Sequence, residues 1–171
     1  MIYLSKGVKE TEKLAGFLLR KIKKLKPRKA IIVALEGELG AGKTVFVKGM
    51  AKVLKVKTKI KSPTFNLMKH YLFKSGVLYH LDCYRLKDHR DLKVFGIKEI
   101  FNNPKNIVLV EWSDRVKKIL PTDHIKIHID HISKNKRKIT VDSPPSLKLR
   151  KGTSSLNEEM PALRSSEGAK K

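Results

Sequence analysis

The residues with the clearest chemical potential form one short glycine-rich segment. It consists of Gly37, Glu38, Leu39, Gly40, Ala41, Gly42, Lys43 and Thr44, and it matches the pattern G-x-x-x-x-G-K-[ST] at every fixed position. Glycines let a backbone wrap closely around a phosphate chain, and the N–H groups that follow attract the anion. In such a loop Lys43 reaches the β- and γ-phosphates and the hydroxyl of Thr44 coordinates Mg²⁺. The alternative is a glycine-rich turn that binds no ligand.

Two carboxylates end apolar runs elsewhere in the chain. Glu111 follows residues 107–110 and Asp82 follows residues 77–81. Because an open parallel sheet binds its ligands at the carboxyl ends of its strands, Glu111 is predicted to occupy the Walker-B position, with Glu in place of the commoner Asp. Asp82 is predicted to lie in the same site. The alternatives are an exposed strand-end glutamate and a structural pair between Asp82 and Arg85.

Weaker constellations occur in the second half of the chain. His124, His128 and Asp130 fall on one face of a late strand; they could hold a metal, although such a set on a lysine-rich strand is usually a solvated face. Cys83 is a poor nucleophile, because the adjacent carboxylate of Asp82 discourages thiolate formation. Aromatic residues, at 6%, are too few and scattered for a base-stacking RNA platform.

The elements around the glycine-rich segment follow from hydrophobic spacing. Apolar residues three and four positions apart predict a helix of about five turns that ends before Pro27. The continuous apolar run at 30–35 predicts a strand buried on both faces, which leads into the glycine-rich segment. Helical spacing resumes over residues 45–54.

Shorter elements fill the rest of the chain. Strands are predicted at 65–73 and 77–82 around a turn at 74–76, helical pieces at 86–101, a second buried strand at 107–110, and paired strands at 124–132 and 138–141. Together with the glycine-rich loop, these elements indicate an α/β fold. The expected architecture is P-loop NTPase-like, with three α/β/α layers and a mixed, partly parallel central sheet.

Length and composition bound the domain organisation. The chain of 171 residues fits one domain. We expect an ATPase domain at residues 1–142 and a basic, disordered tail at 143–171, which is poor in apolar residues. No apolar stretch reaches the length of a membrane span, no secretory signal is visible, and a single cysteine excludes a disulfide scaffold.

The formal net charge of +23 has two interpretations. It is either a footprint for nucleic acid or another polyanion, or a lysine-rich surface without a dedicated partner. The lysines are spread over the whole chain, and arginine is the minority. Charge alone therefore does not decide the function.

Four motifs together resemble the TsaE family. They are GELGAGKT at 37–44, SPTF at 62–65, LYHLDCYRL at 78–86 and VEW at 110–112, in the family's order. The family, known earlier as YjeE, comprises small P-loop ATPases of bacterial tRNA threonylcarbamoyladenosine biosynthesis. Two features depart from its pattern: Cys83 stands where an aliphatic residue is commoner, and the tail after Asp142 is extra.

The resemblance implies a site for ATP and Mg²⁺. Thr44 and Glu111 would hold Mg²⁺, and catalysis would depend on Lys43, Glu111 and, for hydrolysis itself, Asp82. Further contacts with ATP are implied for Thr11 on the adenine side, Val45, the switch-like segment Ser62, Pro63, Thr64 and Phe65 facing the γ-phosphate, and Trp112.

The resemblance also implies partners. The protein would act in the cytoplasm with TsaB and TsaD homologues, where TsaD makes the modification and ATP hydrolysis resets the complex. It would meet tRNA through that complex and would not bind a membrane. The residues leave two other functions open: a small-molecule or nucleoside kinase that uses the same loop, and a non-catalytic RNA-binding module.

Overall fold

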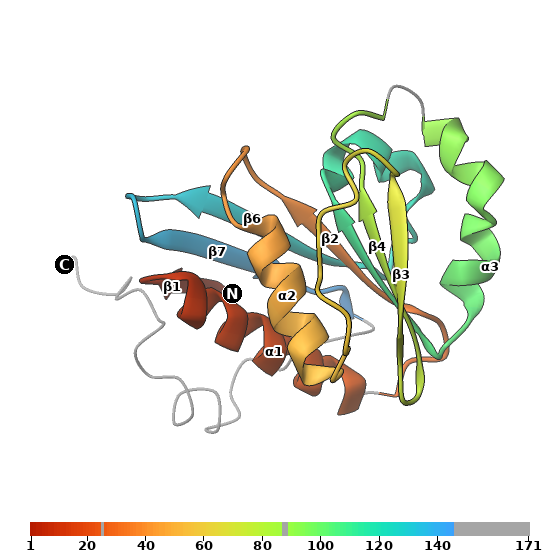
Figure 1. Ribbon diagram of the computed structural model, residues 1–171, viewed down its shortest axis with the longest axis horizontal. Helices are drawn as coiled ribbons and strands as arrows, with labels where there is room; N and C mark the ends of the chain where they lie inside the picture. The colour runs from red at the N-terminus through yellow and green to blue at the C-terminus, as the bar shows by residue number, and fades with distance from the viewer. Residues whose placement is uncertain (25, 87–88, 146–171) are drawn as a thin grey trace.

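The computed structural model describes residues 1–24, 26–86 and 89–145 (Figure 1). In these residues seven strands form one sheet in the order β1-β7-β6-β2-β5-β4-β3. The strands are β1 (Ile2–Ser5), β2 (Ile31–Glu36), β3 (Met68–Phe73), β4 (Gly76–Asp82), β5 (Asn106–Glu111), β6 (Ile125–His131) and β7 (Arg137–Asp142). The four central strands are parallel, whereas β3, β7 and β1 pair antiparallel with their neighbours. The predicted mixed sheet is confirmed.

Helices cover both faces of this sheet. The two long helices, α1 (Val8–Lys24) and α2 (Lys43–Val53), lie side by side on one face (Figure 1). The shorter elements η1 (His89–Phe95), α3 (Ile97–Asn102) and η2 (Ser113–Ile119) belong to the other face. Each layer packs on its own apolar cluster, one containing Leu14 and Phe46, the other Ile100 and Val116. The result is the three-layer architecture expected from the sequence.

Alternation along the central strands divides their side chains between the two clusters. In β2, Val33 and Leu35 pack toward α1 and α2, while Ile32 packs toward α3. Because residues two apart in a strand share a face, the same rule assigns the last residues of β4 and β5 to a face of the sheet. It puts Asp82 on the face of Leu78, and Glu111 on the face of Leu109. Both carboxylates thus lie on the face of the sheet that α1 and α2 cover.

Two details of the sheet differ from the sequence prediction. β3 begins at Met68 rather than at residue 65, because the Asn66 N–H donates to the Pro63 carbonyl at 2.8 Å in a turn that precedes the strand. Phe65 is 84% exposed. The edge strand β1 was not predicted, since four residues give too short an alternation to detect.

The predicted domain boundary coincides with the last strand. β7 ends at Asp142, and most of the predicted tail, residues 146–171, lies outside the described residues, so the division into domain and tail stays a prediction. No helix in the described ranges has both the length and the apolar character needed to cross a membrane.

Candidate active site

The glycine-rich loop joins β2 to α2, as the sequence predicted. Gly37 has a φ of +133°, and a Cβ built on it would lie 2.3 Å from the Ile129 carbonyl oxygen. A side chain at this position would therefore collide with the backbone of β6. Gly42, with a φ of +112°, turns the chain into α2, whose first residue is Lys43. The loop conformation depends on these residues lacking Cβ atoms.

The Lys43 ammonium lies over the loop and is almost fully buried. Its Nζ donates to the carbonyl oxygens of Gly37 at 2.7 Å and Glu38 at 2.9 Å, and it sits 3.8 Å from the centroid of the Trp112 ring. Burial lowers the pKa of Lys43, an effect that the negative charges of Glu111, Asp82 and Asp114 partly oppose. A fixed cation is thus held where the phosphate loop would receive an anion.

Glu111 forms the first of two hydrogen-bonded groups in the site. The Thr44 hydroxyl donates to its two carboxylate oxygens at 2.8 and 3.1 Å. On the other side, His80 Nε2 lies 2.8 Å from Glu111 Oε1, and the His80 side chain is fully buried. The carboxylate of Glu111 is therefore held between α2 and β4.

Asp82 forms the second group with the segment before β3. Its Oδ2 atom accepts hydrogen bonds from the hydroxyls of Ser62 at 2.5 Å and Thr64 at 2.6 Å. Its Oδ1 atom accepts the backbone N–H of Tyr84 at 3.1 Å. These bonds connect the SPTF segment to the end of β4, although Ser62 and Asp82 are 20 residues apart in sequence.

One cavity of about 400 Å³ brings most of the predicted residues together. Its lining combines the loop and the start of α2 with the ends of β4 and β5. It comprises Leu39, Gly40, Gly42, Lys43, Thr44, Val45, Ser62, Thr64, Asp82, Tyr84, Glu111 and Trp112. All of these except Tyr84 were predicted from the sequence.

The remaining predicted residues lie around this cavity. Thr11 lines a neighbouring hollow of about 220 Å³, which also contains Ala41, Val45 and the turn between β6 and β7; its hydroxyl lies 2.8 Å from that of Ser5. Gly37 and Glu38 line a third hollow beyond Trp112. Pro63 is buried in the segment between Ser62 and Thr64. The central cavity is thus not lined by Thr11, Gly37, Glu38, Ala41 or Pro63.

Aromatic and cationic side chains surround the mouth. The rings of Tyr84 and Trp112 lie 5.0 Å apart, and the Arg115 guanidinium lies over both. Trp112 has a φ of +58°, a left-handed conformation that is uncommon for a bulky residue and typical of functional sites. Sequence reasoning missed His80, Tyr84 and Arg115 as site residues; the spacing of His80 and Asp82, two apart on one strand face, was the available signal.

The structural alternatives weighed for the carboxylates do not apply. Glu111 is only 3% exposed, so it is not a solvated strand-end residue. Asp82 bonds to the SPTF segment, while the Arg85 guanidinium stacks on the Phe65 ring, 4.5 Å from its centroid. Asp82 and Arg85 are thus occupied by different neighbours.

The other candidates do not line the central cavity. Cys83 is buried, and burial together with the charge of Asp82 raises the pKa of its thiol to about 12, in agreement with its predicted inertness. His128 Nε2 lies 2.9 Å from Asp130, whereas His124 Nδ1 contacts the Pro121 carbonyl. Within the described part of the chain, no group of three or more His, Cys, Asp or Glu side chains gathers to hold a metal.

The chain combines a strand, a glycine-rich phosphate loop and a helix, and carboxylates stand at the ends of the neighbouring strands. In a three-layer α/β/α fold, this arrangement defines a P-loop NTPase-like protein. Residues 5–139 match the sequence model of "Threonylcarbamoyl adenosine biosynthesis protein TsaE". The chain belongs to the TsaE family.

Individual relatives support this assignment. The chain is 41% identical over 120 residues to the "tRNA threonylcarbamoyladenosine biosynthesis protein TsaE" of Haemophilus influenzae, covering 70% of this chain and 73% of that protein. It is 39% identical over 111 residues to the Bacillus subtilis protein of the same name, covering 64% and 67%. The crystal structure of Bacillus subtilis YdiB superposes with a TM-score of 0.65 at 30% identity and covers 84% of each chain.

Proposed function

We propose that this protein is the Mg²⁺-dependent ATPase subunit of a cytoplasmic complex that makes threonylcarbamoyladenosine in tRNA. One observation carries the proposal: the loop residues Lys43 and Thr44 line the same cavity as the carboxylates Asp82 and Glu111. A loop alone would bind phosphate, whereas hydrolysis also requires groups for the metal and for water. Family membership supplies the pathway, and the partners would be homologues of TsaB and TsaD.

The donor set suits a small, hard cation. The Thr44 hydroxyl and the Glu111 carboxylate lie 2.8 Å apart, and Mg²⁺ prefers such oxygen ligands, which it binds together with substrate phosphates. Bound there, the metal would neutralise charge on the phosphate oxygens. Lys43 would bind the β- and γ-phosphates of ATP, and the loop N–H groups would orient them.

Asp82 is proposed to orient the attacking water. The hydroxyls of Ser62 and Thr64 fix the position of its carboxylate, so a change in the SPTF segment would move Asp82. The segment between α2 and β3 would then act as a switch. Its conformation would depend on what occupies the cavity, and a partner that contacts the segment would sense the difference.

The test measures phosphate release and ATP affinity for the full chain, with and without the TsaB and TsaD homologues and tRNA. Asp82→Asn should keep ATP affinity within a few-fold and lose turnover, while Lys43→Ala should weaken ATP binding. Release of phosphate to water without any acceptor would exclude a kinase. Normal turnover by Asp82→Asn in the presence of the partners would remove Asp82 from its proposed role.

A further inference from the structure

The excess positive charge is concentrated in the first half of the chain. Residues 1–81 contain 19 Lys and Arg against four Asp and Glu, whereas residues 82–145 contain 14 against nine. From residue 39 to residue 81 there are nine lysines and no acidic residue. Besides strands β1 to β4, these stretches build α1, α2 and the segment after α2, and the two helices cover one face of the sheet (Figure 1). One face of the protein is therefore more cationic than the opposite face.

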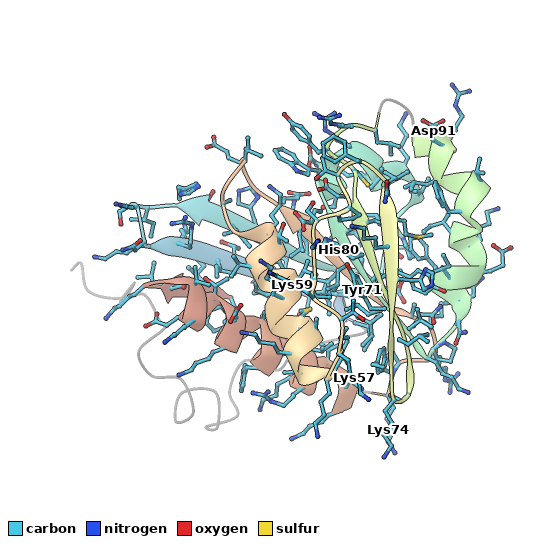
Figure 2. All side chains as sticks on the ribbon, in the orientation of Figure 1. Lys57, Lys59, Tyr71, Lys74, His80 and Asp91 are labelled. Carbon is cyan, nitrogen blue, oxygen red and sulfur yellow. The ribbon has the colours of Figure 1, made fainter. Side chains whose placement is uncertain are left out.

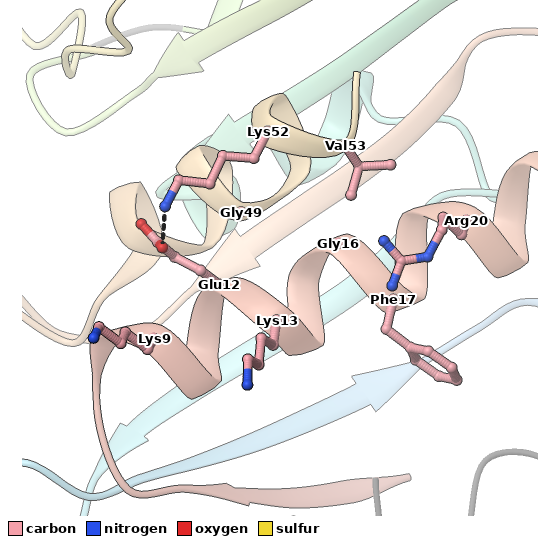
Figure 3. Close-up of a pocket in the computed structure, with 9 residues that line it drawn as sticks. All are labelled: Lys9, Glu12, Lys13, Gly16, Phe17, Arg20, Gly49, Lys52 and Val53. Atoms are coloured by element: carbon pink, nitrogen blue, oxygen red, sulfur yellow. Dashed lines mark hydrogen bonds and ion pairs between the residues drawn. The ribbon is translucent and has the colours of Figure 1, made fainter. Parts of the chain in front are cut away.

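This face contains a groove between α1 and α2. The helices cross closely at Gly16 and Gly49: a Cβ on Gly49 would lie 2.4 Å from the Glu12 carbonyl oxygen. A hollow of about 710 Å³ lies between the helices, with both glycines in its lining (Figure 3). Its polar lining is Lys9, Glu12, Lys13, Arg20 and Lys52. The one acidic member, Glu12, is already paired with Lys52.

A second hollow continues the groove past the end of α2. It has a volume of about 360 Å³ and shares Lys52 with the first. Its other cations are Lys48, Lys57 and Lys59, and Figure 2 shows Lys57 and Lys59 beside α2. We call the seven cations of the two hollows the lysine face: Lys9, Lys13, Arg20, Lys48, Lys52, Lys57 and Lys59. Six of the seven are exposed, and Lys48 is half-buried.

We propose that the lysine face binds the phosphate backbone of structured RNA. Protein interfaces are depleted in lysine and enriched in aromatic residues, yet the only aromatic residue lining these hollows, Phe17, is 4% exposed. A helix that lies on a membrane needs exposed apolar residues to insert. The apolar faces of α1 and α2 are instead buried in the core, which argues against a membrane surface as the ligand. Lysines along a continuous groove match a polyanion of regularly spaced charges.

This proposal does not depend on ATP hydrolysis. Lys43 and the carboxylates belong to a different cavity, which shares with the lysine face only α2 and the segment that follows it. It adds a direct contact with RNA to a protein whose family is named for the biosynthesis of threonylcarbamoyladenosine in tRNA. Binding would be insensitive to base sequence, since lysines in such a groove read phosphates and not base edges.

The test compares two charge-matched double variants of the full chain. Lys57→Glu with Lys59→Glu changes the lysine face, and Lys98→Glu with Lys105→Glu makes the same charge change at two exposed positions in and after α3. Binding of an unmodified tRNA transcript is followed by fluorescence anisotropy from 50 to 300 mM KCl. Circular dichroism and ATP affinity check that each variant remains folded.

We expect the lysine-face variant to lose at least tenfold in affinity at low salt, and the α3-side variant to lose less than threefold. Each phosphate contact contributes about 0.7–0.9 to the slope of log K against log[salt], so the lysine-face variant should also have a slope shallower by about 1–2. Equal losses in both variants would show a diffuse charge effect and overturn the proposal. Polyglutamate and anionic phospholipid vesicles are tested in the same way. If either bound more tightly than tRNA, and the lysine-face variant weakened that binding, the proposal would be overturned in favour of an acidic protein or a membrane.

Discussion

At the scale of single residues, the site consists of two hydrogen-bonded groups that share no side chain. Glu111 is held by Thr44 and His80, and Asp82 is held by Ser62 and Thr64. The first group connects strands to α2, and the second connects a strand end to a loop. Changes in the loop can therefore move Asp82 without displacing Glu111, the carboxylate proposed to bind Mg²⁺. This separation suits the proposed function, in which Asp82 acts in hydrolysis and Glu111 in binding.

His80 provides a test of this division. Its Nε2 atom contacts Glu111, while its Nδ1 atom is buried without a hydrogen-bond partner among the described residues. A buried histidine with an unpaired nitrogen has a free-energy cost, so its position is better explained by holding Glu111 than by stabilising the core. We expect His80→Leu to raise the Mg²⁺ concentration needed for half-maximal ATP binding several-fold.

The measurement is calorimetric titration of ATP at several Mg²⁺ concentrations, with ATP alone as the reference. His80→Gln is the matched control, because its amide can donate near the position of Nε2 and should restore much of the Mg²⁺ dependence. A purely structural role would lower thermal stability in both variants and leave the Mg²⁺ dependence unchanged.

At the scale of elements, the sequence predicts those parts of the fold whose local pattern is complete. The runs that became β2 and β5 are continuous and apolar, and every residue of both strands is buried. The glycine-rich motif and the helix after it are equally local. By contrast, the presence of β1 and the starting residue of β3 depend on pairing with distant segments. A local sequence pattern does not indicate such pairing, so neither could be predicted. The contact of His80 with Glu111 arises from the parallel alignment of β4 and β5, so it too had to come from the structure.

The crossing of α1 and α2 depends on a glycine at a close contact. A Cβ on Gly49 would lie within 3 Å of the Glu12 backbone and of Ala15 Cβ, and backbone atoms there cannot rotate away. We expect Gly49→Ala to destabilise the protein by about 1–3 kcal/mol, the usual cost of overpacking, in spite of the higher helix propensity of alanine. Thermal or urea unfolding measures the difference.

Gly7→Ala is the matched control for this change. Nothing lies within 4 Å of a Cβ on Gly7, which precedes α1 and accepts a backbone hydrogen bond from Thr11. This substitution adds no clash, so it should cost less than about 1 kcal/mol, the loss of a favourable residue at a helix start. If Gly49→Ala were as stable as wild type, the helices would be able to separate without cost, and the groove between them would not be a fixed feature.

At the scale of the whole molecule, the uneven charge should affect stability as well as binding. Like charges repel one another in the compact state, and residues 39–81 contain no acidic side chain to offset their lysines. Salt screens this repulsion, since the Debye length falls from about 10 Å at 0.1 M to about 3 Å at 1 M. We therefore expect the midpoint of thermal unfolding to rise with KCl concentration in the absence of RNA and nucleotide.

The two charge-matched variants locate the repulsion. Lys57→Glu with Lys59→Glu replaces cations within the stretch 39–81, which has no acidic residue. It should therefore raise the unfolding midpoint at 20 mM KCl by about 2–4 °C, the shift that ~1 kcal/mol gives in a chain of this size. It should also flatten the salt dependence. Lys98→Glu with Lys105→Glu acts where Asp91 and Glu99 lie nearby in sequence, so its effect should be smaller. If both pairs stabilised the protein equally, the repulsion would be spread over the whole surface, and the lysine face would not be distinct in its electrostatics.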